Sequence, residues 1–374
     1  MYYFEKNIEF YSVNNKGLLI YLPGSMNISV VNSPLFSIFT SKKTFKENIK
    51  TKYSAIYIHM FSDGFWNDGF EVCKKIAKTL QLGVDQIFCT CVNDINDNFS
   101  NSFKKDGSFC FTKINFETFV NLFSNGNIDS KVVRELTHIN DVPVTIAGVT
   151  RGTNINSSDI TTFLFTDAKL SDLSIKPIVK NIASNSLRSI YLNNNYSFNN
   201  SLFLISSSQV VSKKKISYSE KQFSHFTNIM EKVLHRLSML ILKDGLQNKK
   251  IIEFKINTSF PKKVVKLISD NLVKSDSIKC DITRTYSVHN LTFLVLSVLD
   301  IIKQSLDFFN MDLSNVLENV CIEINGIKLF SNKKFCINKT ILDSIKNASN
   351  QISLNIDVAL GKRNKIYTFY TTWG

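Results

Sequence analysis

Two adjacent threonines, Thr161 and Thr162, lie where a polar segment runs into an apolar one. The segment that begins at Arg151 reads RGTNINSSD, and the run ITTFLF follows it from Ile160. Turn-forming residues followed by such a run predict a loop leading into a buried strand, which is a rigid place for a nucleophile. A threonine hydroxyl is a weak nucleophile unless a base lies within hydrogen-bonding distance. By themselves, two threonines fit better the ordinary packing of β-branched residues in a strand.

The elements that must position these residues alternate between strands and helices. Apolar residues at steps of three and four predict a long helix from Glu220 to Lys243, with Ser219 as its N-cap. Short strands are expected from Val320 to Thr371. We therefore expect an α/β fold in which sheets are sandwiched between helices. The remaining predictions are strands at 53–60, 86–92, 142–149, 160–165 and 250–257, and helices near 72–80, 261–274 and 290–309.

The composition is that of a folded protein, with 44% hydrophobic and 20% charged residues. A net charge of +14 is compatible with a nucleic-acid partner. However, the basic runs at 213–215 and 262–263 are short and lack interleaved aromatic residues. Scattered lysines on solvated faces explain the charge better, so we expect no nucleic-acid partner.

The cysteines and histidines do not form a recognisable metal site. The seven cysteines include no CxxC pair, and Cys89 and Cys91 lack a second ligand pair. His225 and His235 are ten residues apart, which is not the spacing of two ligands on one helix face. Free thiols, the lack of a signal-like N-terminus and the shortness of the apolar run at 291–302 predict a cytoplasmic protein without membrane spans.

The order of residues from Arg151 to Ala168 resembles the signature of the ornithine acetyltransferases, also called glutamate N-acetyltransferases. That signature reads K-G-x-G-M-I-x-P-x-M-A-T-M-L and ends near T-D-A. In an ungapped match, Arg151 takes the position of the lysine, Thr161 that of the alanine and Thr162 that of the threonine. The later T-D-A is present unchanged at residues 166–168.

The resemblance implies a layered sandwich of the N-terminal-nucleophile-like type and a chain that cleaves itself between Thr161 and Thr162. Residues 1–161 would form an α chain and residues 162–374 a β chain, associated as a heterotetramer. Thr162 would be the nucleophile and its new α-amine the base. An acetyl group would pass from N-acetylornithine to glutamate through acetyl-Thr162, without a metal or organic cofactor. Some relatives also accept acetyl-CoA as an acetyl donor.

The resemblance also assigns residues around the nucleophile. Thr90 and Cys91 stand where the family has the threonine and glycine that stabilise the oxyanion. Substrate-binding positions of the family fall on Arg151, on Asn125 and on Leu246, where Leu246 replaces a glutamate. Two alternatives remain open: a degenerate member that retains the fold with weak or no activity, and a related N-terminal-nucleophile aminopeptidase.

Overall fold

A computed structural model of the 374-residue chain divides it into two compact units. Unit 1 comprises Met1–Leu187 and Ser197–Ile241, and unit 2 comprises Arg188–Tyr196 and Leu242–Gly374. The structure describes residues 8–13, 17–23, 28–32, 48–61, 66–93, 111–124, 131–139, 142–152, 160–168, 170, 178–179, 182–183, 186, 190–191, 201–206, 221–243, 250–275, 277–278, 287–311, 320–331, 333–348, 353–360 and 365–373.

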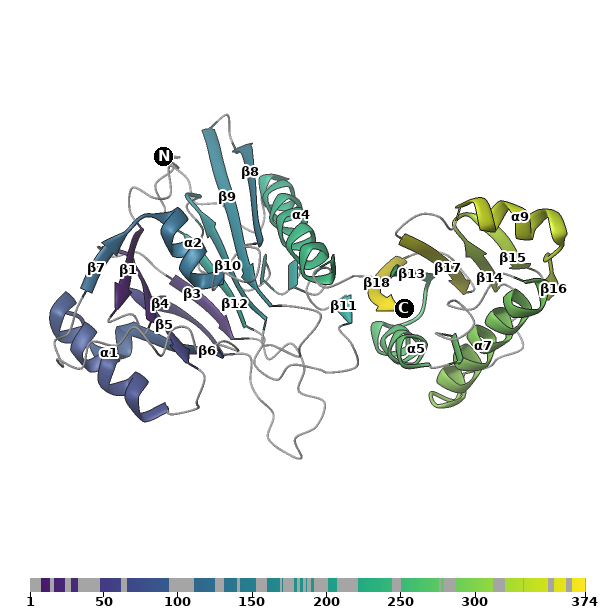
Figure 1. Ribbon diagram of the computed structural model, residues 1–374, viewed down its shortest axis with the longest axis horizontal. Coiled ribbons are helices and arrows are strands. Elements are labelled where there is room, and N and C mark those ends of the chain that lie inside the picture. The colour runs from purple at the N-terminus through teal and green to yellow at the C-terminus, as the bar shows by residue number, and fades with distance from the viewer. Residues whose placement is uncertain are drawn as a thin grey trace. The chain divides into compact units, whose positions relative to one another are not determined.

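Unit 1 contains two sheets in its described part (Figure 1). The first has the strand order β6-β5-β2-β1-β7, and the second has the order β4-β3-β12-β10-β9-β8. The elements are β1 (Glu9–Val13), β2 (Gly17–Tyr21), β3 (Ile28–Asn32), β4 (Asn48–Tyr53), β5 (Ala55–Phe61), α1 (Trp66–Leu80), the 3-10 helix η2 (Val84–Gln86), β6 (Ile87–Asn93), β7 (Phe111–Ile114), α2 (Phe116–Ser124), β8 (Lys131–Ile139), β9 (Val142–Arg151), β10 (Thr161–Thr166), β12 (Ser201–Ser206) and α4 (Lys221–Lys243).

The alternation of side chains along the strands builds these elements into layers. In β2, Leu19 packs with Ile76 of α1, whereas its neighbour Leu18 packs with Phe163 of β10. The first sheet therefore has α1 on one face and the second sheet on the other. Strand β9 lies against α4, because a Cβ added at Gly148 would come within 2.5 Å of a methyl carbon of Leu237. The order of layers is thus helix, sheet, sheet, helix, with α2 adding phenylalanines to the core between the sheets.

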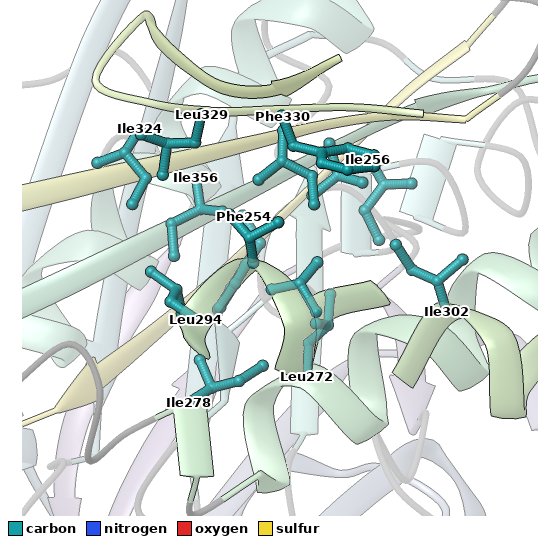
Figure 2. Close-up of a cluster of buried hydrophobic side chains, with 14 of the residues drawn as sticks. Phe254, Ile256, Leu272, Ile278, Leu294, Ile302, Ile324, Leu329, Phe330 and Ile356 are labelled. Atoms are coloured by element: carbon teal, nitrogen blue, oxygen red, sulfur yellow. The ribbon is translucent and has the colours of Figure 1, made fainter. Parts of the chain in front are cut away.

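Unit 2 forms a separate α/β layer around a third sheet, with the order β11-β18-β13-β17-β14-β15-β16 among its described strands. One face of the sheet packs against α5 and α7. Figure 2 shows Phe254 and Ile356 of the sheet facing Leu272 and Leu294 of these helices. The elements are β11 (Ile190–Tyr191), β13 (Lys250–Thr258), α5 (Lys262–Lys274), α7 (Val288–Asp307), β14 (Cys321–Ile324), β15 (Ile327–Ser331), β16 (Lys334–Phe335), α9 (Lys339–Ala348), β17 (Ser353–Leu360) and β18 (Lys365–Trp373).

The α/β fold with layered sheets and helices is confirmed, and so are the long helix α4 and the strands β5, β6, β9, β10 and β13. The expected N-cap Ser219 lies outside the described residues. The prediction of short strands alone after Val320 was wrong, because α9 lies among them. Its start is marked by Asn338, whose Oδ1 accepts the backbone N–H of Ile341 at 2.9 Å, as an N-cap does.

Candidate active site

Thr162 is the second residue of β10, an interior strand of the second sheet of unit 1. It pairs with Thr150 of the antiparallel strand β9 and with Leu202 of the parallel strand β12. All six residues of β10 are buried, and the side chain of Thr162 has no exposed surface. The strand predicted at this position is confirmed, and it holds both threonines within a regular ladder of hydrogen bonds.

The hydroxyl of Thr162 contacts the hydroxyl of Thr150, with 2.7 Å between the two Oγ1 atoms. Thr150 Oγ1 also donates a longer hydrogen bond, of 3.4 Å, to the carbonyl oxygen of Thr161. That carbonyl belongs to the Thr161–Thr162 peptide bond. Thr150 therefore touches both the expected nucleophile and the bond that this nucleophile is expected to cleave.

The sequence alone did not single out Thr150. It lies twelve residues before Thr162 along the chain, and the antiparallel register of β9 and β10 places the two directly opposite each other. Opposite residues of an antiparallel pair share a face of the sheet with Cβ atoms only about 5 Å apart. The contact of Thr150 with Thr162 could have been predicted from the sequence only if the pairing of β9 with β10 and its register had been known.

Lys131 of β8 is a second residue that the sequence did not single out. It pairs with Thr150 from the other side of β9, so the residues 131, 150 and 162 form a row across three strands on one face. The side chain of Lys131 is only 4% exposed, which is unusual for a lysine. The Cβ atoms of these three residues therefore lie on one face of the sheet, with Thr150 in the middle.

The structure places Arg151 on the face opposite to Thr162. Arg151 pairs with Thr161, and Phe163, two residues further on and so on the same face as Thr161, points into the core between the two sheets. Its Nη1 donates a hydrogen bond of 3.3 Å to the carbonyl oxygen of Phe123, at the end of α2. The side chains of Arg151 and Thr162 are therefore not brought together, and the role of Arg151 in binding substrate stays a prediction.

Thr90 and Cys91 lie in β6, an outer strand of the first sheet, opposite Ile58 and His59 of β5. Their backbone positions are described, but their side chains lie outside the described part of the structure. Asn125 and Leu246 also lie outside the described residues. The predicted roles of these four residues in oxyanion stabilisation and substrate binding therefore stay predictions.

Asp167 follows β10 directly and is fully buried. Its Oδ1 accepts the backbone N–H of Thr145 at 2.8 Å, while its Oδ2 has no hydrogen-bond partner among the described residues. Burial raises the pKa of this carboxyl, and the hydrogen bonds from Thr145 offset part of that rise. Next to it, Thr166 Oγ1 accepts the N–H of Ala168 at 3.2 Å. The hydrogen bonds of the T-D-A segment therefore stabilise the end of β10.

Within the described residues, no three His, Cys, Asp or Glu side chains are grouped as the ligands of a metal ion would be. Among the helices of the described part, none is long and apolar enough to span a membrane. Among the cysteines whose side chains the structure describes, Cys73, Cys321 and Cys336 take part in no disulfide bond.

One family model and two curated proteins match parts of the chain. The model of the ArgJ family matches residues 123–372, which is more than half of the chain. The mitochondrial arginine biosynthesis bifunctional protein ArgJ of Aspergillus niger is 23% identical over 137 residues, covering 36% of this chain and 30% of that protein. Its counterpart from Pyricularia oryzae is 24% identical over a match of the same length and coverage. The matched segment therefore spans less than a third of these curated relatives.

Two solved structures also resemble the chain. The arginine biosynthesis bifunctional protein ArgJ of Bacillus halodurans has 14% identity and a TM-score of 0.46, with 56% of this chain and 92% of that chain covered. The PH0078 protein of Pyrococcus horikoshii has 11% identity and a TM-score of 0.35, with 64% of this chain and 87% of that chain covered.

Proposed function

Because the chain belongs to the ArgJ family, we propose that it is an acyltransferase of arginine biosynthesis with Thr162 as its nucleophile. The acetyl group would move from N-acetylornithine to glutamate through an acetyl ester on Thr162. The observation that carries the proposal is the contact of the Thr162 hydroxyl with a second hydroxyl, that of Thr150, at the start of a rigid interior strand. Thr162 holds the position of the nucleophile in the signature of the family.

Self-cleavage before Thr162 would prepare this nucleophile. A hydroxyl needs a base within hydrogen-bonding distance, and the α-amine that cleavage frees on the same residue is such a base. The amine would take the proton of the hydroxyl as the oxygen attacks the acetyl carbonyl, and the ester would hold the acetyl group until glutamate accepts it. Donors aimed at the developing oxyanion would come from the neighbourhood of Thr90 and Cys91.

The arrangement of the strands supports a stable complex of the two resulting chains. The cleavage site at the start of β10 lies inside unit 1, so cleavage would not divide the chain at the boundary between the two units. Residues 1–161 contribute β3, β4, β8 and β9 to the second sheet, and residues 162–374 contribute β12 and the rest of β10. Hydrogen bonds of the ladder and the shared core would hold the two chains together. Their assembly into a heterotetramer is part of the proposal.

One observation favours a degenerate member of the family as the second candidate. The Thr162 side chain is fully enclosed, and Arg151 lies on the other face of the sheet from it. A substrate that binds through both residues would need access that this arrangement does not provide. Such a chain would retain the fold without acetyl transfer.

The test is the intact mass of the recombinant full-length chain, followed by an assay for acetylglutamate formed from N-acetylornithine and glutamate. The proposal expects fragments of residues 1–161 and 162–374, co-purification of both, and acetyl transfer. Thr162→Val should stay uncut and inactive. Thr161→Val, the matched control in the same strand, should be cut because its backbone carbonyl remains.

The outcomes separate the two candidates. A wild-type chain that is cut and transfers acetyl supports the acyltransferase. A chain that is cut but transfers nothing from N-acetylornithine contradicts the assigned substrate and leaves the nucleophile intact. A chain that stays whole and inactive supports the degenerate member.

A further inference from the structure

We propose that Thr150 is a catalytic residue of the self-cleavage, in which its hydroxyl relays a proton from Thr162 to the carbonyl oxygen of Thr161. This inference rests on the proposed function, because it concerns the step that would generate the nucleophile. It assigns a chemical role to a residue that lies outside the signature segment beginning at Arg151. The role would apply to the intact chain, in which the Thr161–Thr162 peptide bond is still present.

The directions of the two hydrogen bonds carry the inference. Thr150 has one hydroxyl proton, and it points at the carbonyl oxygen of Thr161, 3.4 Å away. Either hydroxyl can be the donor across the 2.7 Å contact, and with the proton of Thr150 engaged by the carbonyl its oxygen accepts the proton of Thr162. The two hydroxyls thus form a hydrogen-bonded path from Thr162 Oγ1, the attacking oxygen, to the carbonyl oxygen of Thr161, on which negative charge develops. The second contact is long for a hydrogen bond between oxygens, and such contacts tighten as charge develops.

The surrounding structure holds these two hydroxyls rigidly and shields them from solvent. Thr150 is 1% exposed and Thr162 is not exposed at all, so bulk water does not reach the two hydroxyls from the surface. Both side chains are β-branched and stand on paired interior strands, which restricts rotation about χ1. A preorganised donor in such an environment is worth more than the same donor in water.

The proton relay balances in two steps. In the first, Thr162 Oγ1 bonds to the carbonyl carbon of Thr161 while its proton passes to Thr150 Oγ1 and the proton of Thr150 passes to the carbonyl oxygen. This gives a neutral tetrahedral intermediate. In the second, the C–N bond breaks, the hydroxyl proton of the intermediate moves to the nitrogen of Thr162, and the carbonyl re-forms as an ester. Once the broken peptide bond lets water reach the ester, hydrolysis leaves a free carboxylate on Thr161 and a free amine and hydroxyl on Thr162.

The buried row also contains Lys131, which is paired with Thr150 on the side away from Thr162. Its side chain leaves the backbone on the same face as the two hydroxyls. A positive charge held on that face would favour the stage at which the carbonyl oxygen is most negative, before its proton arrives. Thr150 thus lies between Lys131 and Thr162 in this row of paired residues.

The experiment measures the first-order rate of cleavage of pulse-labelled full-length precursor made by cell-free translation. Thr150→Val keeps the shape of the side chain and removes its hydroxyl, and it should slow cleavage by about 100-fold, the lower end of what a positioned proton-transfer group contributes. Thr150→Ser keeps the hydroxyl and should cleave within a few-fold of wild type. Thr137→Val is the matched control. It removes another buried hydroxyl of the same sheet, one that contacts His225 of α4 at 2.9 Å, and should leave the rate unchanged.

The outcomes distinguish this inference from the proposed function. Cleavage of Thr150→Val at the wild-type rate would overturn the relay and leave Thr162 as nucleophile. A wild-type precursor that never cleaves would overturn both. If Thr150→Val fails to fold, the wild-type rate is measured in mixtures of H₂O and D₂O. Two protons in flight give a curved dependence on the deuterium fraction, and a strictly linear dependence would overturn the relay.

Discussion

Replacing Phe163 by alanine tests whether the core between the two sheets of unit 1 positions Thr162. Phe163 is fully buried beside Thr162 in β10. Its ring centroid lies 4.7 Å from that of Phe203 and 5.2 Å from that of Phe123, and 6.2 Å from those of Phe119 and Phe165. The substitution would leave a cavity surrounded by four rings that the rigid sheets cannot close.

The expected loss is about 3–5 kcal/mol in the free energy of unfolding of unit 1, as for other buried phenylalanines. Each ring pair contributes about 0.5–1.5 kcal/mol beyond burial. These contributions are not independent, so they are already contained in the loss expected for the whole side chain and are not added to it. Since whole domains are stable by about 5–15 kcal/mol, the variant should still fold. The urea midpoint should fall by about 1–3 M.

The assay is urea denaturation of Phe163→Ala in a Thr162→Val background, in which the chain stays in one piece. Leu136→Ala in β8 is the control, because that side chain is 65% exposed and should change stability by less than about 0.5 kcal/mol. A loss below about 1 kcal/mol for Phe163→Ala would refute the stacked core described between the sheets. It would also remove the argument that packing fixes Thr162 in place.

Three further predictions concern other features. Gly148→Ala should destabilise unit 1 by about 1–3 kcal/mol in urea denaturation, because its Cβ would lie 2.5 Å from Leu237 Cδ1 and 2.9 Å from Val233 Cγ1, so that these two side chains of α4 would have to shift. Asp167→Asn should raise the melting temperature more at pH 7 than at pH 4. Burial raises the pKa of the Asp167 carboxyl above its ordinary value of 3.8, so the folded wild-type chain loses stability as the pH rises above 3.8. The asparagine removes the buried charge that causes this loss. Ser287→Ala should cost unit 2 about 0.5–2 kcal/mol in thermal unfolding, because its Oγ caps α7 by accepting the N–H of Asn290 at 3.0 Å.

The sequence by itself determined the local elements of this protein. Periods of three to four residues gave α4 correctly at Lys221–Lys243, and continuous apolar runs gave β9 and β10 within one or two residues. These patterns are local, because the period of an element is a property of the segment itself. The segment from Arg151 to Ala168 also pointed to the ArgJ family, which the match over residues 123–372 confirms.

Helix α9 (Lys339–Ala348) is an element whose local pattern is weak. Its apolar residues Leu342 and Ile345 lie three apart and are buried, and Asn338 precedes them at the cap. The neighbouring short strands led to a prediction of strands throughout this region. A ten-residue helix carries too few turns for its period to stand out against such neighbours.

Only the tertiary structure decided what surrounds Thr162. The pairing of β9 with β10 placed Thr150 against Thr162 and turned the adjacent Arg151 to the opposite face. A shift of one residue in that register would exchange the two, because side chains alternate between the faces of a strand. Register is set by packing between segments far apart in the sequence, such as Gly148 against α4 and Phe163 against Phe203. The sequence could therefore single out Thr162 as the proposed nucleophile, but it could not predict the contact of its hydroxyl with Thr150.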